Sequence, residues 1–222
     1  MFDHLQTDTY TLRLAAENDL AAVKQLDDLA FGVHKGISLE ELQQIVVHGA
    51  VILLFTADGQ LIGESQVLLS PVDFLPYELS SDEAFYYGTA RHPHMRKQGI
   101  GAILAEAQDC FARSMGKQQA TLTVRVENLA SLQLRLKRGF LIHTYLPAFY
   151  PGEAGTGARL VLTKRLDVAV EPAFTNITET AVSFVDEQID LLVHDRIRGL
   201  LANGYVGYAV DASHIYWGKP VG

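Results

Sequence analysis

Residues 1–166 alternate between short runs in which every second position is apolar and longer runs in which apolar positions lie three or four apart. The first period predicts strands and the second predicts amphipathic helices. Asp58-Gly59, between two strand-like runs, predicts a tight hairpin. The predicted strands are 10–14, 50–56, 61–69, 84–90, 120–126, 140–145 and 159–166, and the predicted helices begin near residues 18, 38, 100 and 128.

The order of these elements predicts the fold class. It reads strand, two helices, three strands, helix, strand, helix and two strands. Strands that are interrupted by helices in this way predict an α/β (α+β) fold, with a mixed sheet and helices on both of its faces. Residues 1–166 are long enough to bury the core of such a domain.

The elements predicted after residue 166 have a different character. A proline-containing segment predicts a linker, an amphipathic run predicts a helix that a glycine ends, and an aromatic run predicts a hairpin. These are a linker at 168–177, a helix from Thr178 or Thr180 to Gly204, and a hairpin at 205–217. We therefore divide the chain into a domain of residues 1–166 and a C-terminal extension of residues 167–222. The apolar helix face and the aromatic residues of the hairpin need a covering surface, which leads us to expect a homodimer.

The most informative motif is Arg96-Lys97-Gln98-Gly99-Ile100-Gly101, between a predicted strand and a predicted helix. Its glycines allow close approach of the backbone to a ligand, and the first N–H groups of the helix point toward it. This predicts a cradle for an anion such as a pyrophosphate. The spacing matches neither the P-loop nor the dinucleotide fingerprint. The alternative is an ordinary glycine turn with solvated basic residues.

Charge narrows the ligand class. The formal net charge is -8 and the sequence pI is about 5.4, yet residues 84–105 contain no Asp or Glu and include Arg91, Arg96 and Lys97. Nucleic acids and anionic membranes need a broad basic surface. We therefore expect neither as a partner, and we expect a small polyanionic ligand at the local positive patch.

The apolar runs and the cysteine count limit which cellular compartment and which metal sites we expect. The longest apolar run, 50–55, is too short to cross a bilayer, and the first ten residues lack the pattern of a signal peptide. We expect a cytoplasmic protein. The single cysteine, Cys110, rules out an intramolecular disulfide framework and a cysteine-cluster metal site. We expect Cys110 to be a buried core residue and the protein to use no metal.

Three stretches in the right order resemble the GNAT superfamily of acyl-CoA N-acetyltransferases, over residues 10–166. Leu12-Arg13-Leu14-Ala15 with Asp19 resembles the opening strand and helix of that family. Ala90-Arg91-His92-Pro93 with the following glycine motif resembles its acetyl-CoA motif. Asn128 with Gly139-Phe140 resembles its second motif. The resemblance implies a mostly antiparallel central sheet and acetyl-CoA as co-substrate.

The resemblance also implies binding residues. Backbone groups of the strand before the motif would pair with the pantetheine amides, N–H groups of the glycine loop would hold the pyrophosphate, and a strand amide of Ala90 or Arg91 would polarise the thioester carbonyl. Asn128 would contact the pantetheine arm or simply cap a helix. The implied cofactor-binding residues are Thr89, Ala90, Arg91, Arg96, Lys97, Gln98, Gly99, Ile100, Gly101, Ala102, Asn128 and Arg135.

The implied chemistry is direct attack of a primary amine, from a small metabolite or a peptide amino group, on the thioester. The chain departs from the family at Arg135, where many members have a tyrosine that protonates the leaving thiolate. Arg135 would stabilise the thiolate or bind phosphate, or is an exposed helix arginine. Tyr145 and Tyr150 are substitute acids. The alternative function is a catalytically weak or inactive acyl-CoA-binding or regulatory module.

A base must remove a proton from the amine, because an unperturbed alkyl amine has a pKa of about 10. Glu83, at the start of the central strand, is the candidate that we carry forward. His92, His94 and Glu127 are the alternatives, and Glu83 otherwise only ends a polar loop.

Overall fold

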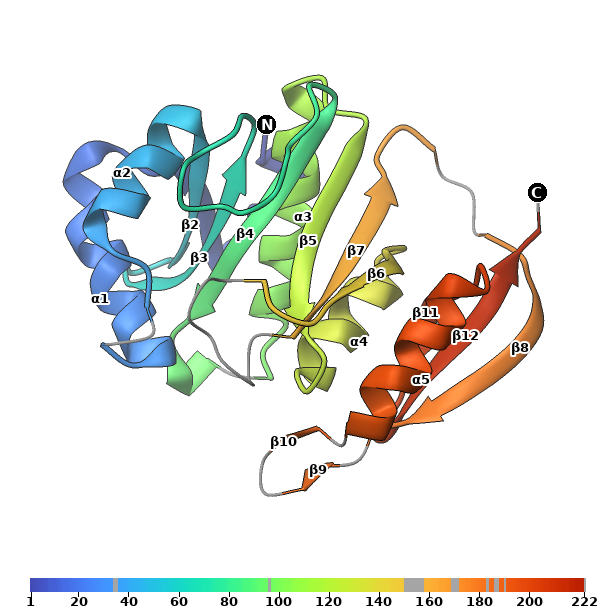
Figure 1. Cartoon of the computed structure of the whole chain (residues 1–222). Helices are drawn as coiled ribbons and strands as arrows, with labels where there is room; N and C mark the ends of the chain where they lie inside the picture. The colour runs from blue at the N-terminus through green and yellow to red at the C-terminus, as the bar shows by residue number, and fades with distance from the viewer. Residues whose placement is uncertain are drawn as a thin grey trace. The chain divides into compact units, whose positions relative to one another are not determined.

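The computed structural model describes the chain except residues 34, 35, 96, 150–157, 169–171, 183, 186, 187, 190 and 222. It divides into two compact units, Met1–Ala120 and Thr121–Gly222, which are described separately below (Figure 1). No helix in the described part of the chain is long and apolar enough to cross a membrane.

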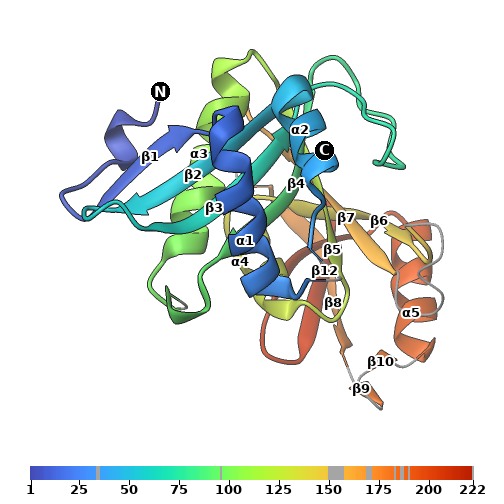
Figure 2. The same cartoon turned by 90° about the vertical axis from the view of Figure 1, so that its left-hand side faces the viewer.

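The first unit is a four-stranded antiparallel sheet with helices on both faces. The strands lie in the order β1-β2-β3-β4, and each is antiparallel to its neighbour. Helices α1 and α2 cover one face and α3 covers the other (Figure 2). The bounds are β1 Tyr10–Leu14, α1 Leu20–Phe31, α2 Leu39–His48, β2 Gly49–Thr56, β3 Leu61–Leu68, β4 Glu83–Arg91 and α3 Ile100–Ser114, with short 3₁₀ helices at Asp3–Leu5, Glu17–Asp19 and Pro93–Met95.

Strand β4 contains a bulge that re-aims its second half. Ser65 lies opposite Thr89, and Val67 lies opposite Tyr86. Between these pairs β3 has one residue, Gln66, whereas β4 has two, 87 and 88. An extra residue of this kind bends a strand and often lies beside a functional site. The bulge therefore directs attention to the part of β4 that leads to the glycine loop.

The second unit is a sheet whose strands follow the order β5-β7-β6-β11-β12-β8. Strand β6 pairs antiparallel with β7 and β11, and β12 pairs antiparallel with β11 and β8. The bounds are β5 Gln119–Arg125, which begins just before the unit boundary, α4 Leu129–Lys137, β6 Leu141–Leu146, β7 Arg159–Arg165, β8 Phe174–Ala181, β9 Phe184–Val185, β10 Gln188–Ile189, α5 Leu191–Ala202, β11 Val206–Val210 and β12 His214–Pro220. The predicted mixed, mostly antiparallel sheet with flanking helices is thus confirmed.

The C-terminal extension differs from its prediction in one respect. Residues Phe174–Ala181 form strand β8 on β12, so the predicted linker ends earlier and the predicted helix starts too early. The segment is rich in threonine, and β-branched residues favour a strand that has a pairing partner. The helix begins only at Leu191. The aromatic hairpin is confirmed as β11 and β12. The division into 1–166 and 167–222 stays a prediction, and the compact units meet at 120 and 121.

Candidate active site

The glycine loop has the backbone shape of an anion site. Gly99 is the N-cap of α3 with φ 78° and ψ -3°, and Lys97 has φ 65°. The N–H groups of Ala102 and Ile103 donate to the Gly99 carbonyl at 2.9 and 3.2 Å, so intrahelical hydrogen bonding begins there. The N–H groups before them belong to the helix end that carries positive dipole character. Alternating backbone conformations at a helix N-terminus form a concave anion cradle.

The loop also leaves space for a ligand. No atom lies within 4 Å of the position that a Cβ on Gly99 would take. Lys97, Gln98, Gly99 and Ala102 are exposed, whereas Ile100 is buried against Gly63 of β3 and Gly101 is buried too. The buried pair anchors α3, and the exposed residues border the open space. Arg96 lies outside the described residues.

A buried carboxylate on β3 contacts the strand that leads to this loop. Glu64 is fully buried, and its Oε1 accepts hydrogen bonds from the Ala90 N–H at 3.1 Å and from Gln66 Nε2 at 3.2 Å. Glu64 Oε2 and Gln66 Oε1 are buried and have no hydrogen-bond partner among the described residues. Burial, followed by the nearby charge of Asp27, raises the pKa of Glu64 to about 8. The group therefore changes protonation state near neutral pH.

The sequence signal for Glu64 was present. Glu64-Ser65-Gln66 is a run of three polar residues in the middle of a strand, and all three are at most 1% exposed. A fully buried strand of an α/β fold is normally apolar throughout. Burying these polar side chains costs folding free energy. A polar interruption of this kind therefore marks a candidate functional site from sequence alone.

A second buried carboxylate lies on the helix that covers this face. Gly63 faces α3, so its neighbour Glu64 points to the opposite face, which α1 covers. On α1, Asp27 is 4% exposed and accepts a hydrogen bond from the Ile37 N–H at 2.7 Å. Burial raises the pKa of Asp27, and the charges of Asp28 and Glu41 act in the same direction. We call Asp27, Asp28, Glu41 and Glu64 the acidic cluster, in which Asp28 also forms an ion pair with Lys24.

Helix α3 holds the bulge in place through side-chain hydrogen bonds. Gln108 Nε2 donates to the Gln66 carbonyl at 3.1 Å and to the Gly88 carbonyl at 3.5 Å. The Tyr86 hydroxyl donates to Asp109 Oδ1 at 2.9 Å. A Cβ on Gly88 would lie 2.6 Å from Gln66 Oε1, so position 88 has no room for a side chain. These contacts fix Gln66 and, through it, the carboxylate of Glu64.

Comparison with known proteins settles what kind of protein carries this arrangement. The model of the acetyltransferase (GNAT) family matches residues 20–140, which is more than half of the chain. The chain belongs to the GNAT family. It is therefore an acyltransferase, and the resemblance drawn from its motifs is confirmed.

Individual relatives agree with the GNAT assignment. The chain is 30% identical over 108 residues to aminoglycoside N(6')-acetyltransferase type 1 of Klebsiella aerogenes, a match that covers 48% of this chain and 70% of that protein. The crystal structure of the ribosomal-protein-S18-alanine N-acetyltransferase of Escherichia coli is similar with a TM-score of 0.59 and 21% identity, over 75% of this chain and 99% of that one. The structure of yncA from Salmonella typhimurium with its cofactor acetyl-CoA gives 0.55 and 18%, over 73% and 97%. The two structures show the shared fold.

Hydrogen-bond donors surround the carboxylate of Glu83, the base expected for the GNAT chemistry. Its carboxylate accepts hydrogen bonds from the Tyr77 hydroxyl at 2.9 Å, from the N–H and hydroxyl of Ser80 at 3.3 Å each, and from Gln119 Nε2 at 3.2 Å. It begins β4, whereas Ala90 and the glycine loop lie at the other end of the strand, about 23 Å away for seven residues of extended chain. Glu83 thus closes the loop before β4, as its alternative interpretation had it, and its role as a base stays a prediction.

The strand residues expected to bind the donor lie on the second half of β4. Thr89 is half-buried and its hydroxyl donates to the Gly88 carbonyl at 2.8 Å, while Arg91 is exposed. Ala90 is buried, and its N–H is already bound by Glu64. That amide therefore polarises a thioester carbonyl only if the Glu64 carboxylate releases it.

The remaining predicted residues belong to the second unit. Asn128 Oδ1 accepts a hydrogen bond from the Ser131 N–H at 3.1 Å, so its role as a helix cap is confirmed. Arg135 is 7% exposed, which excludes the exposed-arginine interpretation. The Tyr145 hydroxyl is hydrogen-bonded to His194 Nδ1, and burial raises the pKa of Tyr145. A raised pKa makes this phenol a weaker acid. Tyr150 lies outside the described residues.

Glu64 should make the stability of this GNAT protein depend on pH. Its pKa is about 8 in the folded state and about 4.3 in an unfolded chain, so the folded state binds the extra proton between these values. Its contribution to stability is fully present below the lower pKa and is lost as pH rises through the higher one. We expect the free energy of unfolding of wild type, relative to Glu64→Gln, to fall between about pH 5 and about pH 9. Urea unfolding of both proteins measures this, and parallel pH profiles would contradict it.

Proposed function

We propose that this GNAT-family protein transfers the acetyl group of acetyl-CoA to a primary amine of a small cationic molecule. The observation that carries the proposal is the open, left-handed N-cap at Gly99, at the start of α3, which is the next α-helix after the bulged strand β4. Membership of the GNAT family supports acetyl transfer to an amine in general. The Salmonella relative, whose structure contains acetyl-CoA, supports the donor. The Klebsiella relative, an aminoglycoside acetyltransferase, supports the acceptor class.

The donor would be held mainly by backbone groups. The N–H groups from Lys97 to Gly101 would bind the pyrophosphate, with the helix dipole and the Lys97 ammonium adding positive charge. The Ala102 N–H, which the sequence included in this set, is bound to the Gly99 carbonyl instead. The open space at Gly99 fits a phosphate that approaches the main chain. Polar backbone groups of Thr89 to Arg91 would pair with the pantetheine amides as a further strand would. Acetyl-CoA then supplies the activated acetyl carbon.

The acceptor would be attracted by the acidic cluster. Its four carboxylates come from α1, α2 and β3 of the first unit. The ionised members of the cluster would favour a molecule with several ammonium groups over an anionic substrate. The net charge of -8 has the same sign and strengthens the preference for a cation.

The proton of the attacking amine would be taken by Glu64. Its Oε2 is unpaired among the described residues, and its pKa of about 8 makes it a far better base than an ordinary carboxylate. The neutral nitrogen then forms a bond to the acetyl carbon, the carbon–sulfur bond breaks, and the electron pair leaves with sulfur. The nitrogen loses its second proton to water as the amide forms. A thiol has a pKa of about 8.5, so water can protonate the leaving thiolate. Asn128, Arg135, Tyr145 and Tyr150 stay predictions.

An acetyl-transfer assay tests the proposed function. Purified protein is incubated with acetyl-CoA and aminoglycosides that carry an amino group at the 6' position. The matched control is an aminoglycoside of the same core that carries a hydroxyl there. We expect thiol release and an acetylated product with the first group only, because an alcohol is a weaker nucleophile than a neutral amine. Acetyl-CoA binding without product from any amine in a broader panel would favour the binding-module alternative instead.

The expected compartment and assembly remain predictions. Cytoplasmic location rests on the sequence pattern alone. The homodimer was inferred partly from aromatic residues of the hairpin, and one of these, Trp217, is fully buried within the second unit. The exposed Leu192 of α5 and Ile177 of β8 are the apolar side chains that still support a further contact surface.

A further inference from the structure

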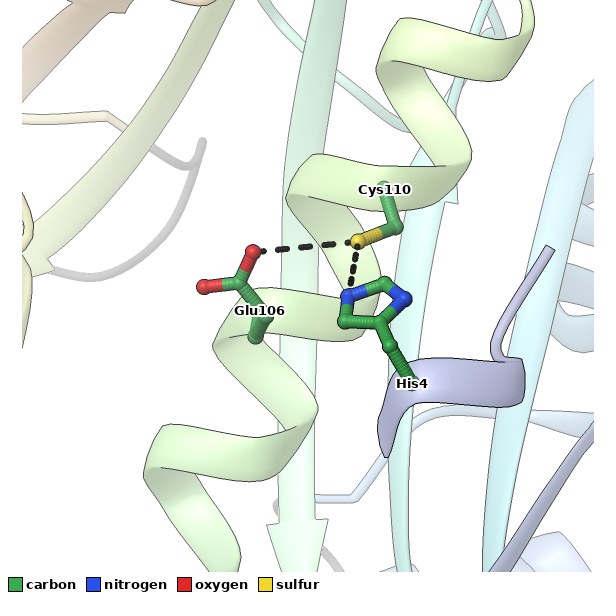
Figure 3. A group of neighbouring side chains, drawn as sticks. All are labelled: His4, Glu106 and Cys110. Atoms are coloured by element: carbon green, nitrogen blue, oxygen red, sulfur yellow. Dashed lines mark hydrogen bonds between the residues drawn. The ribbon is translucent and has the colours of Figure 1, made fainter. Parts of the chain in front are cut away.

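Three side chains of the types that bind metal ions lie close together on the first unit, away from the acidic cluster. His4 comes from the 3₁₀ helix at residues 3–5, and Glu106 and Cys110 are one helical turn apart on α3. His4 is exposed and the other two are half-buried. Figure 3 shows the imidazole and the carboxylate both turned toward the sulfur. Cys110 is therefore not the buried core residue that its sequence position predicted.

The spacing of the three ligand atoms fits one small ion. Cys110 Sγ lies 3.5 Å from His4 Nε2 and 3.7 Å from Glu106 Oε1. All three atoms lie within 4.8 Å of one another. In a tetrahedral zinc site, with bonds of about 2.3 Å to sulfur and about 2.0–2.1 Å to nitrogen and oxygen, ligand atoms lie about 3.3–3.6 Å apart. The two sulfur distances already have nearly the length of tetrahedral edges.

We propose that His4, Glu106 and Cys110 bind a zinc-like divalent transition-metal ion, with a fourth position open to water. Imidazole nitrogen, thiolate sulfur and carboxylate oxygen are the donors that zinc prefers. A thiolate and a carboxylate together balance the charge of a divalent ion. This replaces our expectation that the protein uses no metal, and it is independent of the proposed acetyl transfer.

One contact that competes for the Glu106 carboxylate, an ion pair with Arg113, is weak. Arg113 lies 4.0 Å from Glu106 Oε1, at the limit of an ion pair, and the two side chains are 44% and 33% exposed. Exposed pairs of this kind contribute about 0–1 kcal/mol, whereas a metal–carboxylate bond formed in a three-ligand site is much stronger. Zinc would therefore displace the arginine and fasten the N-terminal segment to α3.

Zinc titration of the full chain tests the proposal. Protein stripped with a chelator is titrated with zinc in competition with a metallochromic dye. We expect one zinc per chain, and an affinity lowered at least about 10-fold by His4→Gln, Glu106→Gln or Cys110→Ser, the smallest loss typical of changes around a metal ion. Cobalt in place of zinc should give a thiolate-to-metal charge-transfer absorption that Cys110→Ser removes.

A matched control uses the other neighbouring histidines of the first unit. The rings of His92 and His94 lie 5.3 Å apart. The double variant His92→Gln/His94→Gln therefore tests whether this other pair of histidines, and not the proposed site, binds the zinc. It should bind zinc as wild type does. Circular dichroism confirms that each variant is folded. Absence of stoichiometric zinc binding by wild type, equal affinity of Cys110→Ser, or a cobalt complex without the sulfur band would each overturn the site.

Discussion

Gly99→Glu is expected to abolish acetyl-CoA binding. The new carboxylate would occupy the open space beside the N-terminus of α3, where the pyrophosphate is proposed to lie. It would compete for the same N–H groups and repel the phosphates. Two charge-assisted hydrogen bonds contribute about 3–6 kcal/mol, so their loss weakens binding by at least about 100-fold. Isothermal titration calorimetry with acetyl-CoA measures the change.

The matched control is Gly99→Ala. Alanine adds no charge, and its methyl group meets no atom within 4 Å. Its only cost is the left-handed backbone conformation at position 99, about 1–2 kcal/mol. This cost is the same in the free and the bound protein. We therefore expect its affinity to stay within about tenfold of wild type. Equal losses in the two variants would mean that the backbone conformation, and not the anion cradle, governs binding. Wild-type binding by both would place the donor elsewhere.

Glu64→Gln is expected to reduce turnover by about 10²- to 10⁴-fold, the usual contribution of a general base. Glutamine has the same shape and keeps an oxygen that accepts the Ala90 N–H, but it cannot take a proton. Acetyl-CoA affinity should be unchanged. In wild type kcat/KM should rise with pH through about 8, the pKa of Glu64, because the base acts in its ionised form. Steady-state kinetics over a pH series measures both effects.

Glu83→Gln separates the two buried carboxylates of the central strands. It removes a charge of the same type from β4, but at the end far from the glycine loop, where four donors bind it. We expect turnover close to wild type in the folded variant. The reverse result, with Glu83→Gln inactive and Glu64→Gln active, would support Glu83 as the base, as predicted from sequence, and remove Glu64 from the mechanism.

The regular part of the fold could be predicted closely because its signals are local. The hairpin at Asp58-Gly59, the cap at Ser38 and the terminating Gly116 and Gly139 all act within a few residues. Within residues 1–166 each element lies within about two residues of its predicted bounds. The start of α1 shows how a competing contact changes a cap. The side chain of Asp19, at the N-cap position, makes no capping hydrogen bond, because its carboxylate binds Arg13 and the Ala16 N–H instead.

The parts that could not be predicted depend on contacts between distant segments. The glycine loop was visible as a motif, but the engagement of the Ala90 amide by Glu64 depends on the register of β3 and β4. Strand β8 depends on a partner, β12, about forty residues later in the chain. The His4 and Cys110 pair joins positions 106 residues apart, which no local pattern can reveal.

Asp27 also fixes where the segment between α1 and α2 ends. Its carboxylate accepts a hydrogen bond from the Ile37 N–H, and a Cβ on Gly36 would lie 2.3 Å from its oxygen, so the start of α2 is tied to α1 independently of the length of the segment between them. Doubling the length of a loop costs only about 0.6 kcal/mol. Insertions ahead of Gly36 would therefore leave α2 and the sheet in place.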